Sequence, residues 1–319
     1  MKLTLAGSIA YDYLMTFPGY FKDHILPDKL ESISLSFLVD GMVKRRGGVA
    51  PNIAYTLALL GEHPMVMGSV GEDFSDYRAW LVEQGVDVSG IRVIPGEFTA
   101  SFFANTDRSN AQIASFYPGA MSFDVQLSLA DLTDTPDLVV IAPTDPTAMI
   151  SYVEEAQALE IPYLYDPSQQ IVRLDGEDIR RGVEGALALC VNDYEFSLVQ
   201  KSTGMSPLEI RRCVRFLIVT RGEEGATIYV DDEEYHIPVV PPRKVVDPTG
   251  VGDAFRGGFL SGYSHGLGWE LCGQMGALAA TYCLETDGPQ SHHYTKEEYI
   301  SRFREHFDDD GRLGILRNR

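Results

Sequence analysis

Short apolar runs alternate with helical patterns along most of this chain, and this alternation is the feature that most constrains its fold. The apolar runs have the length of buried strands, whereas the segments between them repeat apolar residues at helical spacing. We predict strands at 3–6, 65–70, 138–142, 163–165, 188–191 and 216–220, and helices at 51–60, 74–84 and 146–159. Strands joined through helices favour a mainly parallel central sheet with helices on both faces, which is a three-layer α/β/α fold.

Two segments do not fit this alternation. Residues 31–41 place apolar side chains at every second position among mostly serine neighbours, as in a strand with two different faces. Residues 99–119 have the pattern of a hairpin. We therefore predict a small β-sheet lid, formed by insertions at about 13–45 and 96–118, on a single domain that covers residues 1–319.

The charge balance excludes several classes of partner. The chain carries 26 Lys and Arg against 46 Asp and Glu, which gives a net charge of −20 and a pI near 4.6. Such a surface repels nucleic acids and anionic membranes. The four cysteines show no CxxC spacing, and the apolar start of the chain is interrupted by Gly7, Ser8 and Asp12. We expect a cytoplasmic protein with reduced thiols and no membrane span.

The most informative stretch is DPTGVGDAF at 247–255, which follows a strand-like run at 243–246 and leads into a predicted helix. Three amides stand just before this helix, those of Gly250, Val251 and Gly252. They can converge on an anion while the helix dipole adds positive potential. A carboxylate, Asp253, stands where a P-loop would carry its lysine. Asp253 can take the proton of an attacking hydroxyl group, or alternatively it can cap the helix.

Three weaker features accompany this loop. The diglycine at 47–48 precedes a helix that carries Asn52 on its first turn; it lets the backbone approach a ligand, although most such pairs are simple turns. Asn192 and Glu195 follow a strand at a spacing that suits a hydrated Mg²⁺, although a helix cap gives the same pattern. The segment 217–230 is a strand, a glycine turn and a second strand, for which a plain hairpin is the alternative.

Taken in order, Gly-Gly-x₃-Asn, Asn-x₂-Glu, Thr-x-Gly-x₂-Gly and Asp-x-Thr-Gly-x-Gly-Asp resemble the ribokinase-like superfamily of carbohydrate and nucleoside kinases over nearly the whole chain. The resemblance implies a ribokinase-like fold and transfer of the γ-phosphate of ATP to a hydroxymethyl group, with Mg²⁺ required. It implies that Asp253 is the catalytic base and that the amides of Gly250, Val251 and Gly252 form the anion hole.

The same resemblance implies where the nucleotide and its ions bind. The matching positions around ATP are Asn192, Glu195, Thr220, Gly222, Gly225 and Gly252. Glu195 would hold Mg²⁺ through water. Many members of the superfamily also respond to a monovalent cation such as K⁺, for which Asp247 and Thr249 occupy the matching positions.

Within this superfamily the chain most resembles the bacterial adenosine kinases of ribokinase type, a group that includes mycobacterial examples. The stretches that carry the resemblance are GSIAYDYLMTFPG (7–19), SLSFLVD (34–40), RGGVAPN (46–52), AQIASFYPGAM (111–121), DPSQQ (166–170), NDYE (192–195) and DPTGVGDAFR (247–256). The implied reaction converts ATP and adenosine into ADP and AMP.

The resemblance also places residues around adenosine. They are Ser8, Asp12, Ser36, Gly48 and Asn52 for the ribose, and Phe102, Phe116, Gln169 and Gln170 for the adenine. Asp12 and Asn52 would share the 2′- and 3′-hydroxyl groups, a grip that a deoxyribose would half lose. Phe102 and Phe116 would stack on the purine, or alternatively fill the lid. Gln112 would reach the nucleotide side.

Two other functions remain open at this point. A ribokinase or fructokinase would use the same machinery without a wall for the purine, and a catalytically silent nucleoside-binding protein would keep only the fold. The intact Asp253 loop argues against the silent protein. For assembly we predict a homodimer, in which the strand at 31–39 and the lid hairpin pair with a second subunit and bury the spare face of the lid.

Overall fold

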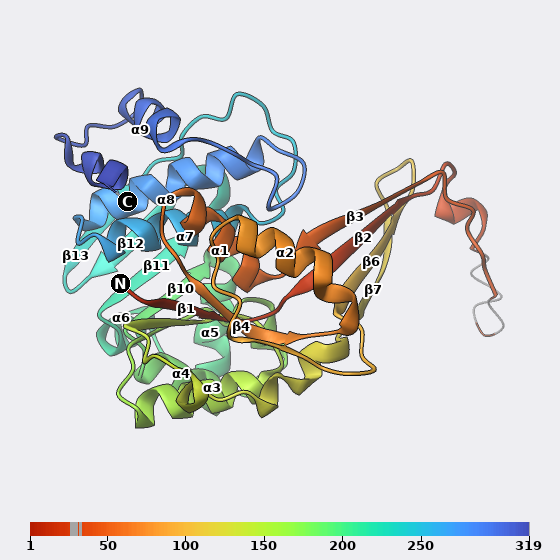
Figure 1. The fold of residues 1–319 in the computed structure, drawn as a ribbon, viewed down its shortest axis with the longest axis horizontal. Coiled ribbons are helices and arrows are strands. Elements are labelled where there is room, and N and C mark those ends of the chain that lie inside the picture. The colour runs from red at the N-terminus through yellow and green to blue at the C-terminus, as the bar shows by residue number, and fades with distance from the viewer. Residues whose placement is uncertain (26–30, 32–33, 319) are drawn as a thin grey trace.

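The computed structural model describes residues 1–25, 31 and 34–318, and its body contains a nine-stranded sheet in the order β13-β12-β11-β10-β9-β8-β1-β4-β5 (Figure 1). Its strands are β1 (Leu3–Ala6), β4 (Met65–Val70), β5 (Ile91–Val93), β8 (Leu138–Ile141), β9 (Tyr163–Tyr165), β10 (Ala188–Asn192), β11 (Phe216–Thr220), β12 (Ala226–Val230) and β13 (Glu233–Ile237). The pairs from β11 to β5 are parallel, whereas β12 and β13 are antiparallel. The predicted parallel sheet is confirmed, and each predicted strand lies within one residue of its expected bounds.

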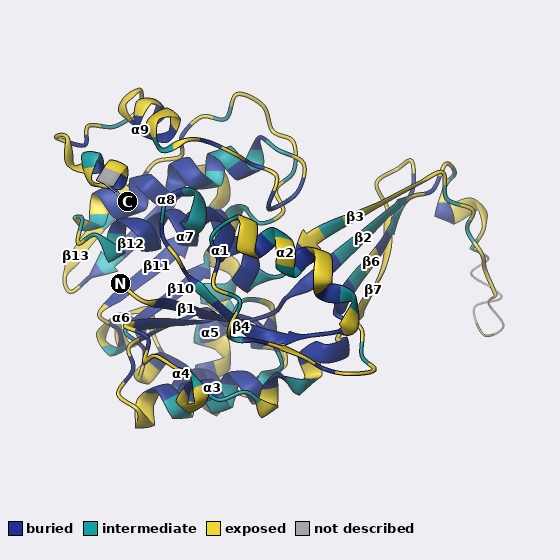
Figure 2. Ribbon diagram, viewed as in Figure 1, coloured by how far each residue is buried: buried dark blue, intermediate teal, exposed yellow. Residues whose placement is uncertain are grey.

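Helices cover both faces of this sheet (Figures 1 and 2). One side carries α1 (Val49–Leu59), α2 (Ser75–Glu83), α7 (Val251–Ser264) and α8 (Trp269–Leu284), with α9 (Lys296–Arg304) packed outside α8; the other carries α3 (Pro146–Ala158), α4 (Gly176–Glu184), α5 (Asp193–Thr203) and α6 (Pro207–Cys213). A hydrophobic core lies on each side of the sheet, and successive strand residues point into opposite cores. Leu138 and Val140 join the core beneath α1 and α7, whereas Val139 and Ile141 join the core beneath α3 and α4. The three-layer arrangement is therefore the one predicted.

A four-stranded sheet in the order β3-β2-β6-β7 projects from the body (Figure 1). Its strands are β2 (Ala10–Thr16), β3 (Gly41–Gly47), β6 (Ala100–Thr106) and β7 (Gln112–Tyr117). Strand β2 pairs antiparallel with β3 and parallel with β6, and β6 and β7 form the predicted hairpin. We call this sheet the lid.

The predicted strand at 31–41 is wrong, because the described part of that segment contains no strand before β3 begins. The ring of Phe37 instead packs edge-on against Phe17 and Phe21, with centroids 5.0 and 4.9 Å apart. This aromatic cluster, at the outer end of the lid, accounts for apolar residues that sequence alone assigned to a strand face. One residue of that pattern, Ile33, lies outside the described residues.

The run at 243–246 is not a strand either. Its backbone follows the end of α8, where the Val246 amide donates to the Leu284 carbonyl at 2.9 Å and the Arg243 amide donates to the Glu285 carboxylate at 2.6 Å. These contacts bring the glycine loop to the start of α7 without a sheet partner.

The four cysteines are free thiols, as expected. None of the helices in the described part of the chain combines the length and the apolar character that crossing a bilayer requires.

Candidate active site

The glycine loop ends in a bend that only glycine fits. Gly250 caps α7 with φ of +77°, and a Cβ atom there would collide with Pro289. Within the described residues, the amides of Gly250 and Gly252 donate to no other group of the chain, while that of Val251 makes a long 3.4 Å bond to the Pro248 carbonyl. The predicted anion hole therefore has free donors at a helix N-terminus.

Asp253 lies on the first turn of α7, and its carboxylate contacts side chains rather than the backbone. Its Oδ2 accepts a hydrogen bond of 2.9 Å from Asn52 Nδ2, and its Oδ1 lies 3.5 Å from Arg256 Nη1. The helix-cap alternative is therefore wrong, because Gly250 occupies the cap position. Burial raises the pKa of Asp253 to about 6, although Arg256 and Asn52 oppose the rise. Such a carboxylate is ionised at neutral pH and can accept a proton.

The diglycine lies against the corner between β1 and β2. A Cβ atom on Gly47 would stand 2.7 Å from Asp12 Oδ2, and one on Gly48, whose φ is +94°, would collide with the Ser8 carbonyl. The Ser8 hydroxyl accepts a 3.3 Å hydrogen bond from the Val49 amide. The structure thus brings together Ser8, Asp12 and the diglycine, as predicted for the ribose.

Asp12 is a half-buried carboxylate on the lid strand β2. Burial raises its pKa to about 6, the nearby Arg45 lowers it, and Asp247 raises it. Its carboxylate faces the backbone of the diglycine and accepts no hydrogen bond from the described residues, so a pair of hydroxyl groups can supply the missing hydrogen bonds.

Asn52 has a role that the sequence did not indicate. Besides its bond to Asp253, its Oδ1 accepts a 2.9 Å hydrogen bond from Gln290 Nε2. Gln290 in turn donates to the Tyr77 hydroxyl and accepts a 3.3 Å bond from Trp80 Nε1. The side chain of Asn52 is thus held by Asp253 and Gln290, and only one of its N–H groups remains free for a ligand. Asn52 was predicted to bind a pair of hydroxyl groups, and the structure leaves it a single donor for them.

Arg45 connects the lid to the glycine loop. Its Nη1 lies 2.8 Å from Asp247 Oδ2, and its Nη2 pairs with Asp287. The other oxygen of Asp247 accepts from the Thr249 amide at 2.9 Å. Burial works against ionisation of Asp247, but these hydrogen bonds and Arg45 hold its pKa below the usual value. Both oxygens of Asp247 are therefore engaged within the chain, one by Arg45 and the other by the Thr249 amide, and the monovalent-cation site at Asp247 and Thr249 stays a prediction.

The predicted nucleotide residues gather at the ends of β10 and β11. Asn192 and Thr220 are register partners in these strands. Asn192 and Glu195 form a capping box at the start of α5, with bonds of 2.7 and 2.8 Å, so the helix-cap alternative is confirmed for this pair. The remaining Glu195 oxygen accepts from Ser168 at 3.1 Å.

The glycine turn at 221–225, which follows Thr220 at the end of β11, leaves open space around Gly222. Gly222 has φ of +54°, and a Cβ atom there would meet nothing within 4 Å. Gly225 has φ of +88° and is packed against the Ile237 carbonyl. The segment also forms the plain hairpin β11–β12 that was its alternative, so the hairpin and a nucleotide site are compatible.

The described residues contain no group of three or more His, Cys, Asp or Glu side chains that could cage a metal. Mg²⁺ near nucleotide phosphates is usually held by water and by one or two carboxylates. Glu195 at this edge fits that kind of site.

The lid presents its two predicted aromatic residues on one face. Phe102 is the register partner of Asp12 in β2 and of Phe116 in β7, so all three side chains point the same way. Phe103 points to the opposite face, where it stacks on Tyr13 with centroids 4.8 Å apart. Phe116 is 49% exposed, so the lid itself does not bury it.

The two predicted glutamines differ in environment. Gln170 is buried, and its Oε1 is an acceptor without a partner among the described residues, whereas Gln169 is exposed. An unsatisfied buried acceptor is costly, and a ligand donor can satisfy it.

Two predicted residues are not brought to this site. Ser36 is exposed next to the Phe37 cluster at the outer end of the lid. Gln112 also lies at that end, where its Nε2 donates to the Thr106 hydroxyl at 3.1 Å. Both predictions are corrected, because the lid strands carry these positions away from the base of the sheet.

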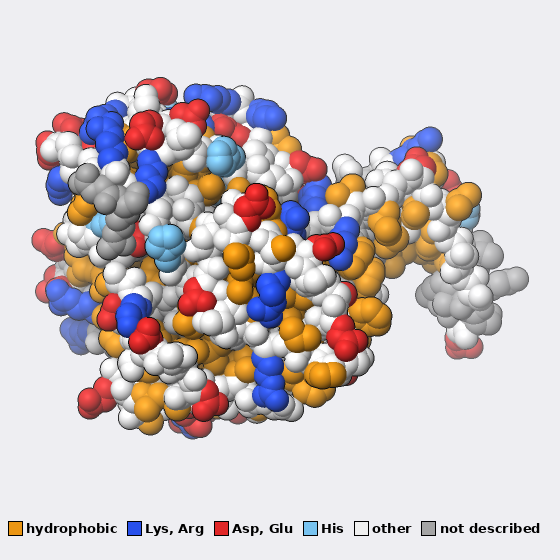
Figure 3. All heavy atoms as spheres, in the orientation of Figure 1, with side chains coloured by type: hydrophobic (Ala, Val, Ile, Leu, Met, Phe, Trp, Pro, Cys, Tyr) orange, Lys and Arg blue, Asp and Glu red, His pale blue; other side chains and the backbone are white. Residues whose placement is uncertain are grey.

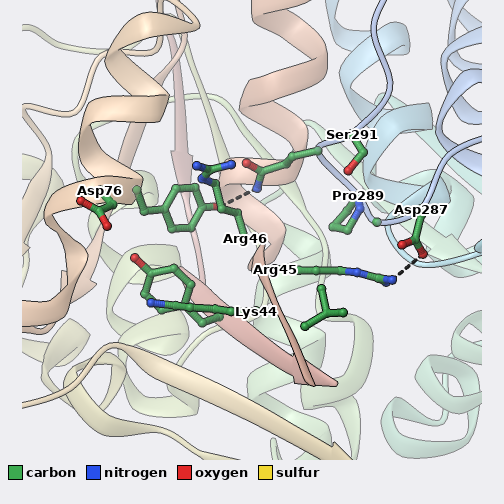
Figure 4. A pocket seen from close by; sticks show the side chains of 12 residues that line it. Lys44, Arg45, Arg46, Asp76, Asp287, Pro289 and Ser291 are labelled. Carbon is green, nitrogen blue, oxygen red and sulfur yellow. Dashed lines mark hydrogen bonds and ion pairs between the residues drawn. The ribbon is translucent and has the colours of Figure 1, made fainter. Parts of the chain in front are cut away.

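A cavity of about 370 Å³ adjoins the site at the edge of β3 (Figure 4). It is lined by Tyr11, Val43, Lys44, Arg45, Arg46, Asp76, Tyr77, Asp287, Gly288, Pro289, Gln290 and Ser291. Two of its lining residues contact the site, Gln290 through Asn52 and Arg45 through Asp247, whereas neither Asp12 nor Asp253 lines the cavity.

Comparison with known proteins agrees with this geometry. The model of the pfkB family of carbohydrate kinases matches residues 16–296. A nucleoside kinase of Methanocaldococcus jannaschii is 29% identical over 307 residues, which cover 96% of this chain and 97% of that protein. The structure of Burkholderia thailandensis nucleoside kinase in complex with inosine has a TM-score of 0.86 at 38% identity and covers 96% of this chain and 98% of that one. Its complex with ADP-inosine has a TM-score of 0.83 at 40% identity, with 96% of each chain covered.

Proposed function

The chain belongs to the pfkB family of carbohydrate kinases, and on that premise we propose that it transfers the γ-phosphoryl group of ATP to the 5′-hydroxyl group of adenosine. We extend the proposal to inosine, which is the nucleoside bound in the Burkholderia thailandensis structure. The observation that carries the proposal is the position of Asp253, which stands beside free amides on the first turn of α7.

Asp253 acts as the general base in this proposal. Its carboxylate takes the proton of the 5′-hydroxyl group as the oxygen attacks the γ-phosphorus. The amides of Gly250 and Gly252 stabilise the charge on the moving phosphoryl group, helped by the α7 dipole. Mutation of one such donor in other enzymes costs about 3–4 kcal/mol of transition-state stabilisation. When bound, Mg²⁺ near Glu195 neutralises charge on the phosphates.

Asp12 and the diglycine hold the ribose. The Asp12 carboxylate, close to Gly47, accepts from the 2′- and 3′-hydroxyl groups, and Asn52 contributes its remaining N–H. Because Asn52 also contacts Asp253, a ribose held here lies close to the base, and the proposal places its 5′-carbon on that side. Closing the lid over the nucleoside excludes water from the phosphoryl group.

The purine lies against Phe102 and Phe116, which share the Asp12 face of the lid. Gln170 meets its polar edge. An amide carries both a donor and an acceptor, so rotation of this side chain suits the 6-amino group of adenosine and the 6-oxo group of inosine. This is the physical reason for including both nucleosides.

A substrate panel tests the proposal. ADP formation is measured with adenosine, inosine, guanosine, cytidine, ribose and fructose. We expect kcat/KM for adenosine and inosine to exceed that for either sugar by at least about 100-fold, because the sugars lack the stacking surface. Turnover of ribose or fructose alone would make the chain a sugar kinase. Nucleoside binding without any ADP formation would make it a silent binding protein.

We also propose that the chain forms a homodimer through the lid. The face opposite Asp12 exposes Met42, Phe103, Ile113 and Tyr117, and Figure 3 shows hydrophobic side chains along the projecting sheet. A sheet face of this kind is stable in water when another surface covers it.

A further inference from the structure

Beneath the glycine loop lies a buried chain of charges that the proposed reaction does not yet use. Arg256 stands three residues after Asp253 on α7, and Asp166 follows the end of β9. Arg256 Nε lies 2.9 Å from Asp166 Oδ2, and its Nη2 donates to Asp166 Oδ1 at 2.9 Å. The Asp166 side chain is fully buried and that of Arg256 is only 10% exposed.

The pairing with Asp166 fixes the direction of the arginine. The guanidinium group meets the carboxylate through one hydrogen bond, from Nη2, and one ion-pair contact, from Nε, and it cannot rotate without losing one of them. The remaining nitrogen, Nη1, is thereby directed toward the loop, 3.5 Å from Asp253 Oδ1. A Cβ atom on Gly252 would stand 3.0 Å from the same nitrogen. The guanidinium group therefore lies close to both the carboxylate of Asp253 and the backbone of Gly252 at the start of α7.

We propose that Arg256, held in place by Asp166, is a positioning residue that aims the Asp253 carboxylate at the substrate hydroxyl group and adds positive charge beneath the anion hole. This inference rests on the proposed function and adds to it the pair that supports the base. Asn52 fixes one oxygen of Asp253 and Arg256 approaches the other, so the carboxylate is constrained on both sides.

The groups around Asp253 are mostly acidic, and Arg256 supplies positive charge among them. Asp253 faces Arg256 on its own helix, Glu195 on α5, Asp166 after β9 and the thiol of Cys283 on α8. Arg256 is thus the cation within a group of carboxylates. Burial raises the pKa of Asp166 to about 7, and Arg256 lowers the pKa of both aspartates.

Removal of Arg256 leaves two buried carboxylates without their cation. The base then holds its proton to higher pH, and its orientation relaxes. Lysine retains the positive charge, but its single ammonium group cannot contact Asp166 and Asp253 in the way that the planar guanidinium group does. The two substitutions therefore separate charge from geometry.

The experiment compares Arg256→Lys, Arg256→Gln, Asp166→Asn and the double variant Arg256→Gln/Asp166→Asn with adenosine and MgATP. We expect Arg256→Lys to lower kcat by about 10-fold, with adenosine affinity unchanged by calorimetry and the acid limb of kcat near its wild-type position. We expect Arg256→Gln to move that limb upward by about one pH unit or more, so that alkaline pH recovers much of the loss. Asp166→Asn should lower kcat alone but add no further loss to Arg256→Gln.

A buried arginine elsewhere gives the matched control. Arg302 pairs with Glu285 through contacts of 2.8 and 2.6 Å, and both side chains are buried. Arg302→Lys should reduce the thermal unfolding temperature as Arg256→Lys does, with kcat and its pH profile unchanged. If Arg256→Gln does not fold, the kcat of Arg256→Lys alone tests the positioning role of Arg256.

Wild-type kcat in Arg256→Lys, or an unmoved acid limb in folded Arg256→Gln, would overturn the inference. So would additive losses in the double variant. Failure of the proposed function has a different signature: the wild-type protein turns over neither adenosine nor inosine, or Asp253→Asn retains activity. If Asp253→Asn is inactive while the Arg256 variants keep wild-type kcat and pH profiles, the positioning role of Arg256 is wrong and the proposed function stands.

Discussion

Asn52 and Asp253 are joined by a 2.9 Å hydrogen bond although 201 residues separate them in the sequence. The bond connects the first turn of α1, next to the diglycine, with the first turn of α7, next to the anion hole. The residues assigned to the ribose and those assigned to the phosphoryl group therefore meet at one carboxylate. In the proposed function, this relationship places a hydroxyl group of the nucleoside within reach of Asp253.

Acid should inactivate the enzyme through two carboxylates. Burial raises the pKa values of both Asp253 and Asp12 to about 6, and both must be ionised, the first to accept a proton and the second to bind hydroxyl groups. A plot of log kcat/KM for adenosine against pH should thus fall below about pH 6 with a slope approaching two. In Asp12→Asn the slope should approach one, and a slope of two in that variant would show that Asp12 does not contribute.

Replacement of Asp12 by alanine should weaken nucleoside binding more than catalysis. Loss of hydrogen bonds to a charged acceptor costs about 1.5–3 kcal/mol each, so we expect KM for adenosine to rise by about 10- to 100-fold with kcat changed less than about threefold. The wild-type preference for adenosine over 2′-deoxyadenosine should also largely disappear. Calorimetry that finds the adenosine affinity of Asp12→Ala intact would exclude the ribose contact.

Arg45 should stabilise the junction between the lid and the body. Its substitution by alanine leaves the mostly buried Asp247 without its cation, so we expect the free energy of unfolding to fall by about 2 kcal/mol and KM for adenosine to rise. Lys44→Ala provides the control, because the neighbouring Lys44 is exposed and lies over the Tyr11 ring. Equal urea midpoints for the two variants would argue against this anchoring role.

The lid face opposite Asp12 should hold two subunits together. Light scattering should give about twice the monomer mass of 35.3 kDa, and Phe103→Glu or Met42→Glu should shift it toward the monomer. Leu208→Glu, at a residue 51% exposed on α6, controls for a charge added to an exposed apolar site. A wild-type protein that is monomeric at micromolar concentration would contradict the dimer.

The parallel sheet could be predicted from sequence because its strands are buried on both faces and therefore read as continuous apolar runs. The glycine loop was equally visible, since the free amides and the base all lie within a few residues of one another. The structure of the segment at 31–41 could not be predicted in this way. Its Phe37 packs in an aromatic cluster whose other members, Phe17 and Phe21, come from a different part of the chain.

The residues that support the base depend on contacts over long sequence distances. Gln290 lies 238 residues from Asn52, in a loop with no periodic pattern, and Asp166 lies 90 residues from Arg256. The sequence likewise gave no sign that Arg45 would pair with the predicted cation ligand Asp247. Arg256 did carry a signal, because it follows Asp253 by three residues on a predicted helix and so shares its face.

The most direct test of the proposed chemistry is the turnover of Asp253→Asn. Asparagine has nearly the same shape and can keep one hydrogen bond near Asn52, but it cannot accept the proton of the 5′-hydroxyl group. We predict that kcat with adenosine and MgATP falls by at least about 100-fold while the dissociation constant for adenosine changes less than about threefold. A folded variant that retains most of the wild-type kcat would contradict the assignment of Asp253 as the base.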